Sequence, residues 1–249
     1  MSGHSKWATI KHQKGAKDKA RGKLFAKVLR QVEVAAREGG GDPDANPTLR
    51  TMFQKARDAS IPMDTIDRAI KRGTGELEGV TYEQITYEGY APGGVAVLVE
   101  VLTDNRNRTG ADIRSLFSRN GGSIAALGAV AWQFDRKGQV LVDRSADEEE
   151  LMLTALDAGA DDLADDGELW RVTTGPTELH RVRSAIEEAG MVVDSADLTM
   201  LPQTTIPLTD AEGAKKVLRL IDALDEHDDV QNVHANFDIP DDILADASV

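Results

Sequence analysis

The 249-residue sequence contains no cysteine, which excludes disulfide bonds, cysteine nucleophiles, thiolate zinc sites and iron–sulfur clusters. Long apolar runs are missing as well: the longest, 95–99 and 124–132, are far shorter than the ~20 residues that cross a bilayer. Residues 1–23 lack the apolar core of a secretory signal, and they are rich in lysine rather than in the arginine and serine of a transit peptide. We therefore expect a cytoplasmic protein without membrane contact.

The sequence also lacks the local motifs of enzymes, metal sites and nucleotide sites. Glycines 73, 75 and 79 do not have the spacing of a dinucleotide fingerprint, and none of the five histidines belongs to an HExxH motif. The acidic pairs at 161–162, 165–166 and 228–229 fall at expected turns, so we interpret them as solvated turns rather than metal ligands. These observations predict a non-enzymatic protein without a cofactor or a metal. The alternative is a metal- or small-molecule-dependent enzyme whose site lies in a cleft between domains.

The net charge of −14 argues at first against a nucleic-acid partner, because a polyanion repels an acidic protein. The charge is unevenly distributed, however. Residues 1–75 carry 16 Lys and Arg against 8 Asp and Glu, whereas residues 76–249 carry 13 against 35. A basic segment joined to an acidic body is typical of a chain that meets a polyanion at one end.

Hydrophobic periodicity divides the chain into segments of two kinds. A basic arm, 1–16, precedes three helices with apolar stripes, which begin near 17, 47 and 62 and define a helical domain over 17–78. Beyond 80 the apolar period becomes that of strands. Strands are predicted at 85–90, 95–102, 192–201, 204–208 and 230–237. Two hairpins are predicted as well, one with strands 130–134 and 140–143 across Arg136-Lys137-Gly138 and one over 163–174. Helices are predicted at 110–120, 148–158, 178–189 and 211–224.

This order of elements predicts an α+β protein. The pattern over 130–202 is close to a ferredoxin-like split βαβ unit, whereas 80–129 has too little sheet to stand alone and is completed by 203–239. We therefore expect an N-terminal helical domain and two ferredoxin-like α/β sandwich domains, one inserted in the other. Residues 240–249 form an acidic tail.

The arm and the start of the first helix provide the first candidate contacts with nucleic acid. Lysines along such a segment neutralise phosphates and release counterions, and an exposed indole can stack on an unpaired base. The alternative is a solvated arm with the indole folded against the body. The candidate residues are Lys6, Trp7, Lys11, His12, Lys14, Lys17, Lys19, Arg21 and Lys23.

A second candidate surface lies around residues 104–119. Thr109 and Asp112 resemble a capping box, which predicts that a helix begins near 110 and that Arg106 and Arg108 lie just before its N-terminus. Free backbone N–H groups, the helix dipole and two guanidinium groups would then meet where a phosphate could bind.

Two more arginines of the same helix, Arg114 and Arg119, extend this basic patch along an otherwise acidic region. The alternative is that the arginines pair with nearby acids such as Glu88 or Glu100 and only hold the sheet together.

Four sequence motifs in a fixed order resemble the YebC/PmpR family. They are Gly3-His4-Ser5-Lys6-Trp7 followed by 10–12 (IKH), then 87–95 (YEGYAPGGV), 103–109 (TDNRNRT) and 130–134 (VAWQF). The resemblance covers essentially the whole chain. It implies three domains, one helical and two α/β, around a cleft.

The resemblance also implies a role in gene expression. Members of the family are described as DNA-binding transcriptional regulators, whereas related proteins, including a mitochondrial translational activator, act at the ribosome and ease synthesis of proline-rich stretches. The expected partner is therefore DNA or ribosomal or transfer RNA, with the ribosome itself as a second possibility. The sequence leaves the target and the oligomeric state open.

Overall fold

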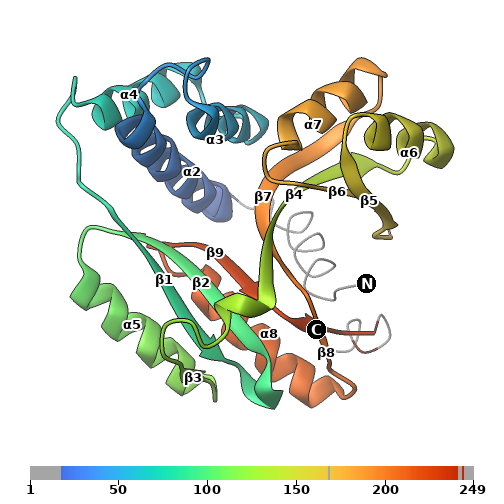
Figure 1. Ribbon diagram of the computed structural model, residues 1–249. Helices are drawn as coiled ribbons and strands as arrows, with labels where there is room; N and C mark the ends of the chain where they lie inside the picture. The colour runs from blue at the N-terminus through green and yellow to red at the C-terminus, as the bar shows by residue number, and fades with distance from the viewer. Residues whose placement is uncertain (1–17, 168, 241–242, 244–249) are drawn as a thin grey trace.

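The computed structural model describes residues 18–167, 169–240 and 243, and its chain runs through three helices and then two sheets covered by helices (Figure 1). The first helices are α2 (Asp18–Gly39), α3 (Pro47–Asp58) and α4 (Met63–Thr74). Their apolar stripes form one core, in which Val32, Leu49 and Ile66 are fully buried. Asn46 caps α3, because its side-chain oxygen accepts a hydrogen bond from the backbone N–H of Leu49.

The first sheet has the strand order β3-β1-β2-β9, and every pair in it is antiparallel. These strands are β1 (Glu83–Tyr90), β2 (Ala96–Thr103), β3 (Ser123–Ile124) and β9 (Val230–Ala235). Helices α5 (Arg106–Arg119) and α8 (Ala211–Asp225) cover one face of the sheet. Val97 and Val99 of β2 belong to the core on that face, together with Phe117 of α5 and Leu220 of α8.

The second sheet has the order β5-β6-β4-β7 and is also antiparallel. Its strands are β4 (Phe134–Asp143), β5 (Ala160–Asp165), β6 (Leu169–Thr174) and β7 (Val193–Pro202), and its helices are α6 (Glu148–Asp157) and α7 (Leu179–Glu188). This βαββαβ order in one antiparallel sheet is the ferredoxin-like arrangement. The α+β class with N-terminal helices is therefore confirmed.

Three sequence expectations about local structure are wrong. Residues 130–143 do not form a hairpin across Arg136-Lys137-Gly138, because β4 runs unbroken from Phe134 to Asp143. Gly138 lies inside β4, where a Cβ atom would clash with the side chain of Thr174, so its role is close packing rather than a turn. Helix α5 begins at Arg106, not near 110. The expected strand at 204–208 is reduced to β8 (Ile206–Pro207), which pairs with β10 (Phe237–Asp238).

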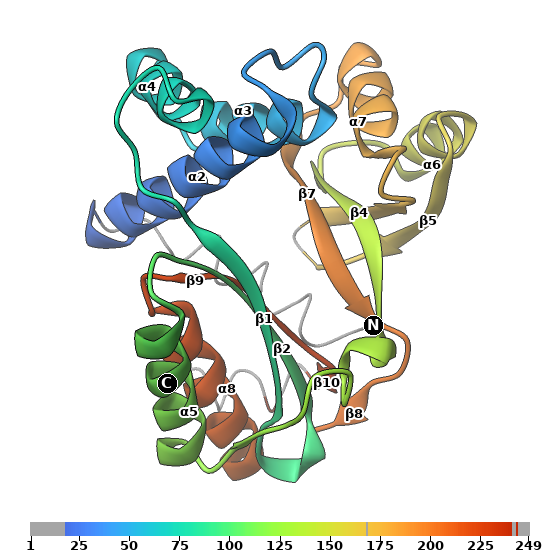
Figure 2. The ribbon, with the colours of Figure 1, turned by 60° about the vertical axis from the view of Figure 1, so that its left-hand side comes forward.

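Two one-turn 3₁₀ helices lie between strands. Pro92–Gly94 connects β1 to β2 within the first sheet, and Ala131–Gln133 lies just before β4, where the chain enters the second sheet. Ala96 and Leu98 of β2 face away from α5 and α8 and pack with Val130 and Phe134. β2 is therefore covered on both faces, which explains its almost continuous apolar sequence. Figure 2 shows α2 lying across the region between the two sheets. Among the described residues, no helix is both long and apolar enough to cross a membrane.

Candidate nucleic-acid interface

The structure describes only some of the cationic residues selected from the sequence. Lys19 and Arg21 lie on α2, but their side chains fall outside the described part of the chain. The candidates that lie wholly outside the described residues are Lys6, Trp7, Lys11, His12, Lys14 and Lys17.

Lys23 is described, and its contacts are within the protein. Lys23, Lys27 and Arg30 recur at helical spacing along α2. Their side-chain nitrogens donate hydrogen bonds to three backbone carbonyls, those of Glu226 (2.8 Å), Asp225 (2.6 Å) and Asp228 (2.6 Å) respectively. The carbonyls of Asp225 and Glu226 lie at the C-terminal end of α8, where helical carbonyls lack partners and the dipole favours cations, and that of Asp228 lies in the loop just after it. The basic face of α2 therefore caps α8.

Asp229 is the acidic centre of this contact. Its Oδ2 atom accepts hydrogen bonds from Thr109 Oγ1 (2.6 Å) and from Arg108 (2.9 Å), and its Oδ1 atom lies 3.3 Å from Arg30. Burial opposes its ionisation, but the hydrogen bonds from Thr109 and Arg108 and the charges of Arg108 and Arg30 outweigh burial and lower its pKa. Asp229 is only 6% exposed, so the expectation of a solvated turn is wrong for this residue.

The N-terminus of α5 differs from the expected capping box. Asn105 is the N-cap, and its side chain accepts a hydrogen bond from the N–H of Arg108 at 3.1 Å. Thr109 is instead buried inside the first turns, where it donates to Asp229. As a consequence, Arg106 and Arg108 belong to the first turn of the helix rather than preceding it.

The two arginines of this turn have different partners. Arg106 forms an ion pair with Glu83 at 2.9 Å, and both side chains are more than half exposed. Arg108 contacts Asp104 (2.8 Å) as well as Asp229, and its hydrogen bonds to Asp229 and Asp104 raise its pKa.

The carboxylates expected to pair with these arginines have other partners. Glu88 accepts hydrogen bonds from the backbone N–H groups of Gly128, Val130 and Ala131. Glu100 accepts a hydrogen bond from Asn232 at 2.7 Å and lies 3.4 Å from His234. Pairing with acids is therefore correct for Arg106 and Arg108, but their partners are not Glu88 and Glu100.

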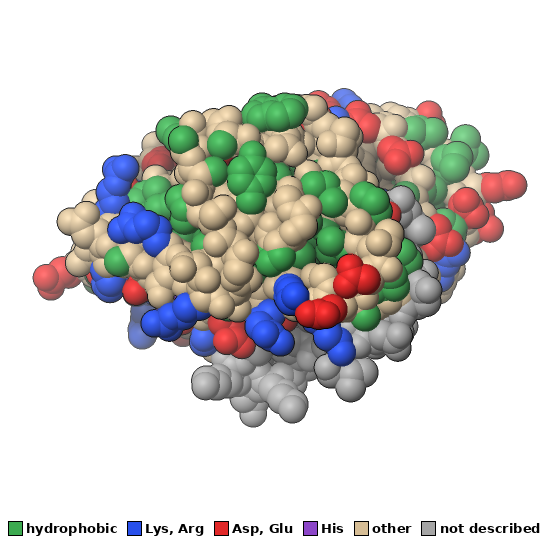
Figure 3. Space-filling model, turned by 90° about the horizontal axis from the view of Figure 1, so that it is seen from below, with side chains coloured by type: hydrophobic (Ala, Val, Ile, Leu, Met, Phe, Trp, Pro, Cys, Tyr) green, Lys and Arg blue, Asp and Glu red, His purple; other side chains and the backbone are tan. Residues whose placement is uncertain are grey.

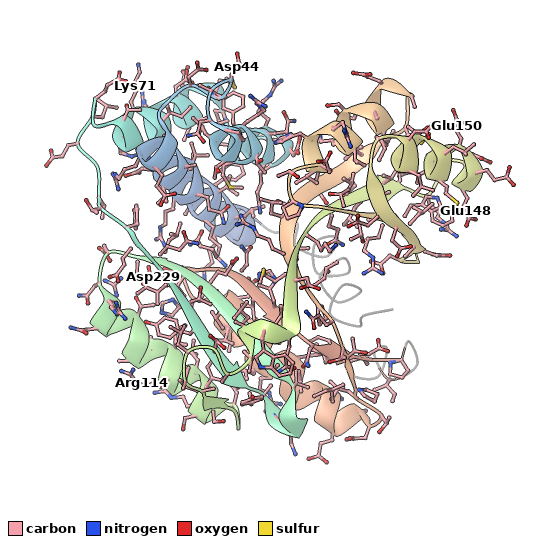
Figure 4. All side chains as sticks on the ribbon, viewed as in Figure 1. Asp44, Lys71, Arg114, Glu148, Glu150 and Asp229 are labelled. Atoms are coloured by element: carbon pink, nitrogen blue, oxygen red, sulfur yellow. The ribbon has the colours of Figure 1, made fainter. Side chains whose placement is uncertain are left out.

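Arg114 and Arg119 are exposed on α5, and neither forms an ion pair with another described residue. Figure 4 labels Arg114 at the edge of the molecule. Burial raises the pKa of Tyr87 on β1, and the charges of Arg106 and Arg114 oppose that rise, so both arginines act on the same edge of the first sheet.

A hollow of about 550 Å³ lies between α2 and α5. Lys23, Arg30 and Arg108 line it together with four acidic residues, Asp104, Glu226, Asp228 and Asp229. Tyr82 closes one side, with the Arg30 guanidinium 5.6 Å from its ring centre. This pairing of cations and acids is not visible in the sequence, because about 200 residues separate α2 from its partners, 203 in the case of Lys23 and Glu226.

No group of three or more metal-ligating side chains occurs in the described ranges. What the site offers is instead a set of ion pairs between α2, α5 and residues 225–229. Beside them, Arg114 and Arg119 of α5 are exposed, where a polyanion could contact them.

Comparison with known proteins identifies matches over nearly all of the chain. Residues 5–76 match the protein family described as "TACO1/YebC protein N-terminal domain". Residues 82–237 match the family described as "TACO1/YebC second and third domain". A "probable transcriptional regulatory protein" of Rubrobacter xylanophilus is 60% identical over the full length of both chains. A protein of Halothermothrix orenii with the same description is 54% identical over 98% of each.

A solved structure shares the fold. The crystal structure of a conserved hypothetical protein from Aquifex aeolicus is 46% identical, with a TM-score of 0.84, and the alignment covers 91% of this chain and 94% of that one. The resemblance inferred from the sequence motifs is thus confirmed, and the described relatives are named as regulators.

Proposed function

Because this chain belongs to the TACO1/YebC family, we propose that it is a cytoplasmic, non-enzymatic, nucleic-acid-binding regulator of gene expression. The relatives named as probable transcriptional regulators support this proposal. So does the concentration of positive charge in the first third of a chain whose net charge is −14. Nucleic-acid binding by such a chain depends on cations that the acidic body does not neutralise.

The observation that carries the proposal is the pair Arg114 and Arg119. They lie in the acidic part of the sequence, yet both are exposed and have no ion-pair partner among the described residues. Figure 3, a view from below, shows Lys and Arg side chains along the left and lower margins of that face, with Asp and Glu side chains among them, around a centre of uncharged and hydrophobic side chains. Exposed arginines such as Arg114 and Arg119, without an ion-pair partner among the described residues, suit contact with a phosphate backbone.

Arg106 can join this surface at little free-energy cost, because exposed ion pairs such as Arg106–Glu83 contribute only about 0–1 kcal/mol. Arg108 and Lys23 are less available. Arg108 would have to leave two carboxylates, and Lys23 would have to leave the carbonyl of Glu226. The proposed contacts are therefore the arm (Lys6 to Lys17), Lys19, Arg21, Arg106, Arg114 and Arg119, with Lys23 and Arg108 recruited only after their internal bonds break.

Ribosome-associated translation is the second candidate function. Trp7, between the lysines of the arm, favours it, because aromatic side chains stack on the unpaired bases of RNA. Sedimentation of cell extract on a sucrose gradient separates the two candidates. Migration with ribosomal subunits supports the translation role, and recovery of free protein on promoter DNA supports the transcription role.

A salt titration of nucleic-acid affinity tests the common proposal. We expect binding to weaken steeply with salt, and Arg114→Glu with Arg119→Glu to weaken it further and flatten its salt dependence by about one to two phosphate contacts. The matched control is Arg68→Glu with Lys71→Glu. These two side chains on α4 are exposed and unpaired within the described residues, and α4 lies at the opposite end of the molecule from α5 (Figure 1).

Affinity that does not change with salt, or that survives deletion of residues 1–16 together with the α5 substitutions, would refute the proposal. Equal losses in the α5 and α4 variants would show that only net charge matters and that α5 is no contact surface.

A further inference from the structure

A cavity of about 300 Å³ lies where the helical part meets both sheets. Its walls come from α2, α3, β1, β2, β4, β7 and β9. Figures 1 and 2 show these elements converging on the centre of the molecule. This volume is at the lower end of the range for small-ligand sites, so the cavity has room for one small ligand.

Two buried amide oxygens in its walls have no hydrogen-bond partner among the residues that the structure describes. They are Oε1 of Gln31 on α2 and Oε1 of Gln231 on β9, and Gln231 is only 9% exposed. An acceptor that is buried without a partner is unfavourable by about 1–3 kcal/mol, so two in one cavity require an explanation.

Three side-chain donors of the cavity wall already have partners, and one of them, Lys55 Nζ, lies 2.8 Å from Asp197. The side-chain N–H of Gln231 donates to the carbonyl of Asp229, and that of Asn232 donates to Glu100. Burial opposes ionisation of Glu100, but its contacts with His234 and Asn232 and the charge of Arg136 lower its pKa, so it too is an acceptor. The unsatisfied capacity inside the cavity is therefore for a ligand that donates hydrogen bonds.

The exposed part of the wall carries a cation, whereas the buried part carries hydrogen-bond acceptors. Arg136 of β4 is exposed, and it forms no ion pair or hydrogen bond with another described residue, although its charge acts on Glu100. The wall also includes the apolar side chains of Met52 and Met200, and Met200 is the cross-strand neighbour of Arg136. A matching ligand has a donor at its buried end, an apolar or flat middle and an anion at its outer end.

We propose that this cavity binds one nucleotide unit that carries an exocyclic amino group. The amine donates to the free oxygens of Gln31 and Gln231, the base packs among the apolar side chains, and the phosphate pairs with Arg136. A free amino acid fits less well, because its ammonium and carboxylate lie on one carbon and cannot reach both ends. This inference rests on the proposed function, since it names the unit of nucleic acid that the protein recognises.

Isothermal titration calorimetry with AMP and IMP tests the cavity. AMP has an exocyclic amine and an unprotonated N1, whereas IMP has a carbonyl in place of the amine and a proton on N1. We expect AMP to bind at least about tenfold more tightly than IMP, since the amine can donate to both buried oxygens, whereas IMP keeps one ring N–H and brings a carbonyl oxygen against the acceptors. Gln231→Met should abolish this preference, and Arg136→Gln should weaken both ligands alike. Arg219→Gln, an exposed and unpaired residue of α8 within the described part of the chain, is the matched control and should change neither.

Single-stranded oligonucleotides identify the source of the nucleotide. Oligoadenylate preferred over oligoinosinate by the wild-type protein but not by Gln231→Met indicates a base within a strand. A preference confined to the mononucleotides indicates a free nucleotide. Both results support the cavity as a nucleotide site, provided that Gln231→Met retains the wild-type melting temperature. If Gln231→Met is unstable, the affinities of the exposed Arg136→Gln variant for AMP and IMP decide whether the cavity binds them, because both should be weaker than in the wild-type protein.

Equal binding of AMP and IMP together with equal binding of the two oligonucleotides would overturn the inference, as would the absence of binding to all four. The proposed function fails separately. Salt-dependent binding of nucleic acid without preference for the amine refutes only the cavity, whereas AMP binding without affinity for any nucleic-acid strand refutes only the proposed function.

Discussion

Arg183 of α7 binds Asp58 at the end of α3 through both terminal guanidinium nitrogens, at 2.7 and 3.1 Å. Its third nitrogen, Nε, donates to Glu187. Only 10% of the Arg183 side chain is exposed. The two-point contact fixes both the distance and the orientation of α7 relative to α3, and it joins the helical part of the chain to the second sheet.

Breaking this contact should destabilise the protein. We expect Asp58→Asn to lower the free energy of unfolding by about 1–3 kcal/mol, because it leaves a nearly buried guanidinium with one carboxylate fewer. Urea denaturation in a double-mutant cycle with Arg183→Met measures the coupling. The exposed pair Lys137–Asp161 is the control, with an expected coupling below about 1 kcal/mol. Equal coupling for the two pairs would contradict the assignment.

Asp229 should make stability depend on acid pH. Its pKa is lower in the folded protein than the usual 3.8, so its charged form stabilises the fold above the pKa of the unfolded chain. That contribution is lost as the pH falls through the lower, folded-state pKa. Urea midpoints measured from pH 7 down to pH 2.5 should therefore fall more steeply for the wild-type protein than for Asp229→Asn.

At pH 7, Asp229→Asn should lower the free energy of unfolding by about 2–4 kcal/mol, since Arg108 and Arg30 would lose a buried anionic partner. Asp104→Asn is the control, because Asp104 contacts the same arginine but is 48% exposed. A loss for Asp104→Asn as large as that for Asp229→Asn would show that Asp229 is not the centre of the cluster.

Glu88 should control the order of the segment that carries the exposed Trp132. Burial raises the pKa of Glu88, but hydrogen bonds from the N–H groups of Gly128, Val130 and Ala131 outweigh it and hold the carboxylate ionised. In Glu88→Gln the side-chain NH₂ cannot accept these bonds. We expect amide hydrogen exchange at 128, 130 and 131 to become at least about tenfold faster. Unchanged exchange, or an equal effect of Glu83→Gln, would count against this role.

Two glycines should respond oppositely to alanine. A Cβ atom at Gly89 would lie 2.5 Å from the ring of Phe117 and 2.6 Å from the carbonyl oxygen of Ser123, so Gly89→Ala should destabilise the protein by about 1–3 kcal/mol. Gly22 lies in α2, where such an atom would have no neighbour within 4 Å among the described residues outside the backbone of its own helix. Gly22→Ala should therefore stabilise the protein by about 0.5–1 kcal/mol. Thermal unfolding of both variants checks the two signs.

Regular amphipathic segments made much of the fold predictable. The apolar stripe of α8 and the cap at Asn46 appear directly in the sequence, and the order of elements predicted a ferredoxin-like unit. The continuity of β4 was not predictable, because Arg136-Lys137-Gly138 has the composition of a turn, and the packing of Gly138 depends on Thr174, a distant residue. The domain boundaries at 16, 78, 129, 202 and 239 stay predictions that limited proteolysis can test.

The candidate interface was less predictable than the fold. The sequence indicates which side chains are cationic but not which are already paired, since pairing depends on acids about 200 residues away. Arg108 and Arg114 have equal charge and lie on one helix, yet the first is held by two carboxylates and the second has no ion pair within the described ranges. Only the folded arrangement distinguishes a structural arginine from one open to a partner.

The oxygens of residues 225–229 compete with any polyanion for the cationic side chains of α2. Lys23, Lys27 and Arg30 already have carbonyl and carboxylate oxygens in the positions that phosphate oxygens would take. A phosphate backbone that binds here must replace these hydrogen bonds with its own. The free energy it gains is only the difference between two similar sets of bonds. Under the proposed function, we therefore expect a weak encounter with nucleic acid to leave these bonds intact, and a ligand that also binds the arm or α5 to replace them.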